Sequence, residues 1–177
     1  TGGADVLFTN DASIDSQASE ANDLVLDVGV ASVFFNEDIG AVANGGLGQL
    51  LVEEADTSVI FGQADDETAT DTGPVNTLNL VGDDNDATFD LDIGSLDIVG
   101  SIVLNGGSSA LTVTTTSDDV RLNGAVTLSS DVRVDTDETA ATGTGGADVL
   151  FTNDASINSQ ASEANDLVID AGVASVF

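Results

Sequence analysis

Residues 4–10 read ADVLFTN, residues 31–37 read ASVFFNE, and residues 57–63 read TSVIFGQ. Each stretch is a short run of apolar and β-branched residues that ends in Phe followed by a polar residue or Gly. Short runs of this kind, bounded by turn-forming residues, are typical of β-strands. Because the stretches recur at nearly equal intervals, we expect one similar strand for every turn of a repeating backbone path.

The same rhythm continues along the chain in two series of predicted strands. The first series continues as ATFDLD at 87, SIVLNGG at 101, DVRLNGA at 119 and ADVLFTN at 147. The second series is DLVLDVG at 23, QLLVEEA at 49, TLNLVGD at 77, SLDIVGS at 95, ALTVTTT at 110 and DVRVDTD at 131. Apolar and polar residues alternate within them, and turn-forming stretches such as NGG and GDDND separate them. The sequence therefore predicts an all-β protein with about twelve short strands in its first 143 residues.

Repetition favours a β-solenoid, in which successive coils stack and bury a continuous core. We expect about six coils per 143 residues, with Phe8, Phe35 and Phe61 stacked as a ladder inside the tube. A barrel and a series of tandem β-sandwich domains are the alternatives. Trp and Tyr, the usual interior aromatics of a sandwich, are absent from the chain. This absence favours the solenoid.

A second, longer repeat appears at the two ends. Residues 144–177 repeat residues 1–34, and only three positions differ. The differences are Asp15/Asn158, Leu26/Ile169 and Val28/Ala171. We therefore interpret 1–143 as one full long-period repeat and 144–177 as the start of the next, and we expect the chain to continue. The alternative is one domain with a duplicated hairpin at each end. Neither a targeting segment nor an apolar run of membrane-spanning length is visible.

The composition excludes most catalytic chemistry. Cys, His, Lys, Met, Trp and Tyr are all missing, and Arg121 and Arg133 are the only cations. Zinc, haem and iron–sulfur sites thus lack their usual ligands. The common pairs of nucleophile and base cannot be assembled either. Paired carboxylates remain, but the clefts in which such pairs cleave glycosides are usually lined by aromatic residues. We expect that the protein is not an enzyme.

The charge is strongly negative. Thirty-two acids against two Arg give a formal net charge of −30, although 41% of the residues are hydrophobic. A chain this acidic is not expected to bind nucleic acid or an anionic membrane. It has enough apolar residues to build a core, so it is not a disordered acidic tail. The lack of sulfur and the scarcity of tryptic sites suit long exposure outside a cell, and we expect an extracellular or cell-surface location.

Acidic turns provide candidate calcium ligands, because Ca²⁺ prefers carboxylate oxygens. The sharpest cluster is Asp83, Asp84 and Asp86 with Asp90 and Asp92, followed by Asp65, Asp66 and Glu67. The competing interpretation, which we favour, is that these are solvated acidic turns. GTGGADVLF at 143 also imitates a calcium-binding nonapeptide, with Thr144 where the second Gly belongs. We expect no obligatory cofactor; calcium is the ion that the chain could bind.

GADVLFTNDASI, GVASVFFNEDIG and DVRLNGAVTLSSDVRVDT resemble the repetitive regions of giant secreted bacterial surface proteins, such as filamentous-haemagglutinin-like adhesins. The resemblance covers almost the whole chain, but its motifs are loose, and the long insert at 63–74 departs from it. It implies a right-handed parallel β-helix and a role in adhesion or in an extracellular filament or sheath. The expected partner is the same chain, by self-association or by continuation along the filament. The alternative is a calcium-rigidified adhesin stalk of tandem β-sandwich domains that binds a glycan or a cell surface.

Overall fold

The computed structural model describes the backbone of most of the chain. The described residues are 3–8, 13–18, 20–43, 45–62, 77–80, 89–92, 101–115, 119–137, 145–152 and 155–177. Regular secondary structure in these ranges consists of β-strands alone, so the predicted all-β class is confirmed. No helix in them has the length and apolar character needed to cross a membrane.

In the described residues, fifteen strands form three sheets. The six-stranded sheet contains, in spatial order, β1 (Val6–Phe8), β3 (Ser32–Phe35), β5 (Ser58–Phe61), β8 (Ser101–Leu104), β11 (Ala125–Leu128) and β14 (Ile157–Ser159). The five-stranded sheet contains β2 (Leu24–Gly29), β4 (Leu50–Ala55), β7 (Phe89–Asp92), β10 (Val120–Asn123) and β13 (Val149–Thr152). The four-stranded sheet contains β6 (Thr77–Leu80), β9 (Leu111–Thr115), β12 (Val132–Asp135) and β15 (Leu167–Asp170).

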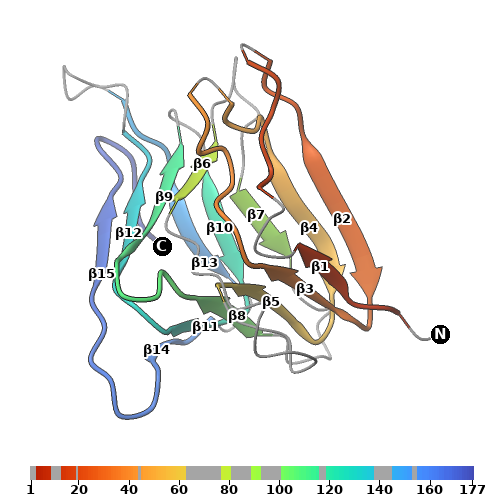
Figure 1. The fold of residues 1–177 in the computed structure, drawn as a ribbon. Helices are drawn as coiled ribbons and strands as arrows, with labels where there is room; N and C mark the ends of the chain where they lie inside the picture. The colour runs from red at the N-terminus through yellow and green to blue at the C-terminus, as the bar shows by residue number, and fades with distance from the viewer. Residues whose placement is uncertain are drawn as a thin grey trace.

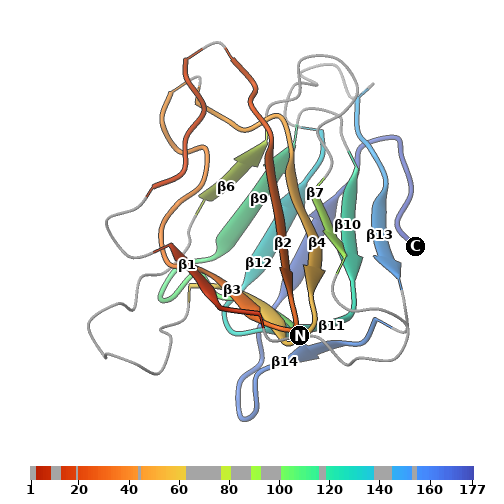
Figure 2. The same ribbon diagram turned by 90° about the vertical axis from the view of Figure 1, so that its right-hand side faces the viewer.

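The chain visits the three sheets in a fixed order. From β5 onward, each strand of the six-stranded sheet is followed by one of the four-stranded sheet and then one of the five-stranded sheet. Each strand from β1 to β12 pairs in parallel with the strand that occupies the same place one turn later in the chain. Figures 1 and 2 show the result: three sheets stand side by side as three walls, with the N-terminus near β1 and β2. Each sheet is open and has two edge strands.

The three walls share one hydrophobic core. Its buried side chains come from alternate positions of strands in all three sheets, because successive residues of a strand point to opposite faces. Each wall contributes such pairs of core residues, for example Val126 and Leu128 of the six-stranded wall. The five-stranded wall contributes Val120 and Leu122, and the four-stranded wall contributes Val132 and Val134. The residues between them in β10, β11 and β12 are only partly buried. The alternation of apolar and polar residues in the sequence thus distinguishes the side chains that face the core from those that face outward.

The predicted Phe ladder is confirmed. The rings of Phe8 and Phe35 stack with centroids 5.1 Å apart, and those of Phe35 and Phe61 stack at 4.9 Å. The strands that carry them pair in parallel with the three Phe residues in register. Phe35 and Phe61 are fully buried. Leu104 and Leu128 continue the same row in β8 and β11.

Two details of the sequence interpretation are wrong. First, the strands form three families instead of two: β7, β10 and β13, expected to follow the Phe series, lie in the five-stranded sheet with β2 and β4. Second, the described residues of 1–143 contribute five strands to the longest sheet, and not the six that about six coils would require; these strands are β1, β3, β5, β8 and β11. The error arose because strands of different walls have the same alternating pattern, so two walls were counted as one series. Twelve strands lie in the described part of residues 1–143, the number that was predicted, but the strand predicted as SLDIVGS at 95 lies outside the described residues and β11 was not predicted as a separate strand.

The alternatives to stacked parallel strands do not fit the structure. Sandwich domains are built from antiparallel strands, whereas all strand pairs in the described residues are parallel. The terminal copies are not hairpins either. Val6 pairs with Val33, and the equivalent Val149 with Val176, in parallel.

The ladder generates a test with a matched control in the same strand. Phe35→Ala should lower the free energy of unfolding by about 3–5 kcal/mol, because it removes a large, fully buried side chain from the stack. Phe34→Ala, on the outward and only partly buried side of β3, should lower it by about 1 kcal/mol. Urea unfolding followed by circular dichroism measures both, and equal losses would contradict the inward ladder.

Candidate functional site

The predicted calcium ligands lie largely beyond the described structure. Asp83, Asp84 and Asp86 fall in 81–88, and Asp65, Asp66 and Glu67 fall in 63–76, so these candidates lie outside the described residues. Asp90 and Asp92 are in β7, where the backbone pairs with β10 on one side and β4 on the other. Within the described part, no group of three or more acidic side chains is placed to hold a metal ion.

The nonapeptide-like stretch is partly described. Residues 145–151 lead into β13, and their acidic residue, Asp148, is bonded to other layers of the stack. Its own N–H donates to Oδ1 of Asp119 at 2.9 Å, and its Oδ1 accepts the N–H of Ser175 at 2.9 Å. One carboxylate oxygen of Asp148 is therefore occupied in linking neighbouring strands.

This bond is one of a series that sequence reasoning missed. In five places the Oδ1 atom of an Asp accepts a backbone N–H from the next turn of the chain, 27 to 35 residues later. The pairs are Asp5 with Ser32 (2.8 Å), Asp15 with Val42 (3.1 Å), Asp119 with Asp148 (2.9 Å), Asp131 with Asp166 (2.9 Å) and Asp148 with Ser175 (2.9 Å). We call these five Asp residues the carboxylate ladder.

A sequence signal for the carboxylate ladder does exist. Asp5, Asp119, Asp131 and Asp148 each stand directly before the Val that opens a strand. At this corner the backbone leaves one wall and enters the next, and the carboxylate accepts the N–H from the neighbouring layer. Hydrogen bonds to a charged acceptor are stronger than those to a neutral one. Some of the acidic side chains thus stabilise the fold by accepting hydrogen bonds from the backbone.

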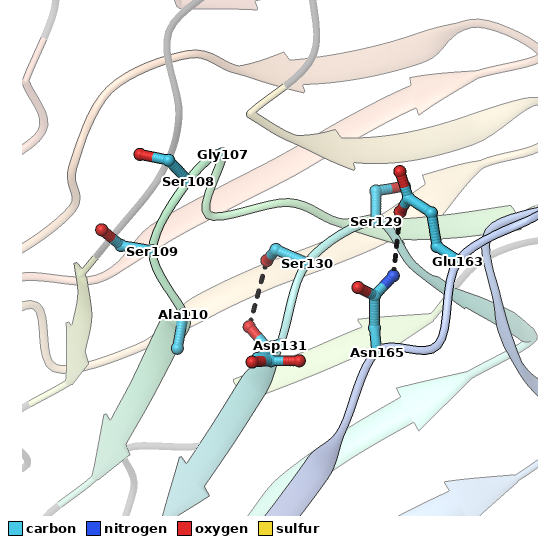
Figure 3. Close-up of a pocket in the computed structure, with 9 residues that line it drawn as sticks. All are labelled: Gly107, Ser108, Ser109, Ala110, Ser129, Ser130, Asp131, Glu163 and Asn165. Atoms are coloured by element: carbon cyan, nitrogen blue, oxygen red, sulfur yellow. Dashed lines mark hydrogen bonds between the residues drawn. The ribbon is translucent and has the colours of Figure 1, made fainter.

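A polar surface depression lies where three corners meet. Its volume is about 240 Å³, and it is lined by Gly107, Ser108, Ser109, Ala110, Ser129, Ser130, Asp131, Glu163 and Asn165. Figure 3 shows these side chains on the segments before β9, between β11 and β12, and before β15. They come from three successive layers of the six-stranded and four-stranded walls.

Three polar side chains of this depression, those of Ser130, Asp131 and Asn165, form hydrogen bonds between neighbouring corners. Ser130 Oγ accepts the N–H of Gly106 at 2.7 Å and donates to the carbonyl of Asp131 at 3.0 Å (Figure 3). Asn165 Nδ2 donates to the carbonyl of Leu128 at 2.8 Å and to Glu163 Oε2 at 3.1 Å. No aromatic side chain lines the depression, although sugar sites commonly stack a ring against the ligand. The depression therefore has the geometry of hydrogen-bonded turns between two walls and lacks the aromatic ring that is common in sugar-binding sites.

Arg133 bridges two layers of the four-stranded wall. Its Nη2 lies 2.7 Å from Asp135 Oδ2 and 3.5 Å from Asp170 Oδ2. Asp135 and Asp170 stand in register on β12 and β15, so without the guanidinium they would be adjacent like charges. The hydrogen bond with Asp135 raises the pKa of Arg133 above its ordinary value, and the side chain stays charged. Because Arg133 is 43% exposed, the pair contributes little free energy after solvent screening.

Some buried polar atoms lack a partner. Both side-chain polar atoms of Asn36 are buried without a hydrogen bond, as are Oδ1 of Asp56 and Oδ1 of Asp137. Asn36 directly follows β3, and Asp56 lies between β4 and β5. Both are on different layers from the depression, so they add no chemical group to it.

Comparisons of this chain with protein-family models, with curated proteins and with solved structures gave no match.

The carboxylate ladder can be tested with the two copies as mutual controls. Asp5→Ala should lower the free energy of unfolding by about 1–3 kcal/mol, because its partner Ser32 is buried, 5% exposed, and its N–H would lose its acceptor. Asp148→Ala should cost less, because its partner Ser175 is exposed and water replaces the lost acceptor. Asp5→Asn, which keeps Oδ1, should recover most of the loss. Urea unfolding measures all three, and equal effects of the two Ala variants would contradict this account.

Proposed function

We propose that this chain is a segment of a right-handed parallel β-helix within a giant extracellular repeat protein, and that it gives length and stiffness to a rod, filament or sheath. One observation carries the proposal: three parallel sheets, visited in a fixed order, share a single core. A backbone that passes three walls in turn and pairs with itself one turn later is the path of a β-helix. Each added turn repeats the same contacts, so the path extends without a new fold.

Stiffness follows from the direction of the hydrogen bonds. In such a stack the strand ladders and the carboxylate ladder both run along the axis, from one layer to the next. Bending the rod would have to lengthen bonds in at least one wall. The Phe stack and the aliphatic rows beneath the walls add continuous packing in the same direction.

The remaining observations favour a structural role over catalysis or ligand recognition. The sequence contains no His, Cys or Lys for nucleophilic chemistry, and Ser130 and Asn165 of the polar depression form hydrogen bonds between corners. An extracellular location is supported by the composition and by the resemblance to secreted surface proteins. A net charge of −30 leaves nucleic acid outside the proposed partners. The partner is more of the same protein.

The acidic surface implies a need for cations. Residues 1–143 carry 27 acids and two Arg. The unit spans between four and five layers, so at about 4.8 Å per layer it advances roughly 22 Å. The rod therefore bears about one net negative charge per Å, more than the one per ~1.7 Å of duplex DNA. We propose that mobile cations, including calcium, lower this repulsion.

Raising the ionic strength from about 0.01 M to about 1 M, which shortens the Debye length from about 30 Å to about 3 Å, should raise the melting temperature by several degrees. The comparison that separates screening from a calcium site uses NaCl and CaCl₂ at equal ionic strength, followed by a chelator. A further rise with calcium that the chelator reverses would indicate a specific site. A melting temperature that does not change with ionic strength would contradict the proposed charge repulsion.

The rod itself is tested with recombinant chains of two, four and six consecutive 143-residue units. Negative-stain images should show a uniform filament whose length grows by about 22 Å per unit, since the unit spans between four and five layers of about 4.8 Å. Aligned samples should give a meridional reflection at the layer spacing. Beads joined by narrow linkers would instead support a stalk of separate domains and overturn the proposed function.

A further inference from the structure

The chain contains three Asn–Gly pairs, at residues 44, 105 and 123, and the second of them lies in the turn after β8. Asn–Gly is a chemically labile pair, because a Gly side chain does not hinder attack of its backbone nitrogen on the preceding Asn. In such a reaction the nitrogen of Gly106 forms a bond to Cγ of Asn105 and the bond from Cγ to Nδ2 breaks. The side-chain nitrogen leaves as ammonia together with the proton of Gly106. Water then opens the succinimide ring to Asp or isoaspartate, which adds one negative charge.

The structure requires both residues of this pair. A Cβ at residue 106 would lie 2.5 Å from the backbone nitrogen of Leu111, so only Gly fits there. Asn105 links its own turn to the preceding layer: its Nδ2 donates to the carbonyl of Gly62 at 2.6 Å, and its Oδ1 accepts the N–H of Gly107 at 2.9 Å. The packing and the hydrogen bonds of this corner therefore depend on a labile pair.

Ser130 binds the group that would start the reaction. The N–H of Gly106 donates to Ser130 Oγ at 2.7 Å, and Ser130 is only 6% exposed. The hydroxyl of Ser130 donates its own hydrogen to the carbonyl of Asp131 at 3.0 Å (Figure 3). Because a hydroxyl has one hydrogen, Ser130 acts toward Gly106 as an acceptor. The nitrogen of Gly106 thus keeps its hydrogen in a buried bond, whereas attack on Asn105 needs that hydrogen removed.

The position of Ser130 follows from the register of the six-stranded sheet. Leu104 of β8 pairs with Leu128 of β11, so Gly106 and Ser130 stand two residues beyond a paired position in neighbouring layers. The N–H of Ser129 still donates to the carbonyl of Leu104 at 2.9 Å. One residue further, the side chain of Ser130 provides the bond between the layers. The hydroxyl therefore continues the interlayer bonding at the point where both strands have ended.

We propose that Asn105 is a latent deamidation site and that the hydroxyl of Ser130 protects it in the folded chain. The attacking nitrogen and Cγ must approach each other in a defined orientation. The bond from Gly106 to Ser130 and the two bonds of the Asn105 side chain oppose this movement. The reaction is then limited to the moments at which the corner opens locally. This inference does not depend on the proposed filament.

Deamidation here would weaken the contact between two layers. A carboxylate has no hydrogen to donate, so the product would place an oxygen against the carbonyl oxygen of Gly62, where Asn105 Nδ2 now donates. Isoaspartate would also lengthen the backbone beside Gly106, which fits closely against its neighbours. The sequence contains no Cys or Met, the residues with the best-known oxidation chemistry. Asn thus remains among the residues that limit the chemical lifetime of the chain.

The test compares the deamidation rate of Asn105 in the folded 177-residue chain and in two variants of adjacent residues. Ser130→Ala should increase the rate several-fold, because the N–H of Gly106 loses its acceptor. Ser129→Ala is the matched control and should leave the rate unchanged, since the bond of Ser129 to Leu104 uses the backbone N–H. Samples are incubated in mildly alkaline buffer and analysed by mass spectrometry after digestion at acidic residues. Circular dichroism checks that both variants fold.

Asn123–Gly124 provides an internal reference in every sample. Digestion separates it from Asn105, because Asp118 and Asp119 lie between the two pairs. Asn123 ends β10 in another wall, so Ser130→Ala should not change its rate. Faster deamidation at both pairs would indicate general loosening of the fold and would overturn the specific role of Ser130. An equal increase in the Ser129→Ala variant would overturn it as well.

Two further measurements decide whether the folded corner protects Asn105 at all. A synthetic peptide of residues 101–110 gives the rate of the same pair without the fold, and the folded chain should react several-fold more slowly. Hydrogen exchange at the amide of Gly106 should be slow in the unmodified chain and faster in the Ser130→Ala variant, as expected for a lost bond. Equal rates in peptide and chain, or a rate at Asn105 that does not respond to Ser130→Ala, would overturn the proposal.

Discussion

The structure depends on parallel backbone hydrogen bonding between one turn of the chain and the next. In the six-stranded wall, the separation in sequence between paired residues ranges from 24 residues, between β8 and β11, to 43 residues, between β5 and β8. No pair in the described strands is closed by a short hairpin, so each must hold through burial of its inward side chains. The shared core therefore has to be continuous from one layer to the next. The stacked rings of Phe8, Phe35 and Phe61 and the aliphatic side chains beside them provide this continuous packing.

The acidic composition is partly explained by the corners. At Asp5, Asp119, Asp131 and Asp148 the backbone turns into a new wall, and a carboxylate accepts the N–H that arrives from the next layer. Such a residue must be small, must accept a strong hydrogen bond and must tolerate water on its other oxygen, and Asp meets all three conditions. Other carboxylates face outward, and those that stand in register, such as Asp135 and Asp170, would be adjacent like charges without Arg133.

The long repeat and the turn of the backbone have different lengths. One 143-residue unit does not contain a whole number of turns, and a sequence that recurs therefore meets a different wall. The sequence of the terminal copies must therefore be able to form the same local structure in different sheets. Their local bonds, at Ser16 and Ser159 or at Asp5 and Asp148, are made within one turn or to the next, whichever wall they occupy.

Local patterning was enough to define the all-β class and the inward row of Phe, because alternation and spacing are properties of a strand and its immediate surroundings. It did not define the wall that each strand joins, the number of layers or the carboxylate ladder. Identical sequence shows why: ADVLFTN at 4 gives a strand of the six-stranded sheet, and ADVLFTN at 147 gives a strand of the five-stranded sheet. Seven residues specify a strand and its buried side, but its neighbours are set by the length of chain that returns it to the stack, and that information is present only in the folded arrangement of the whole chain.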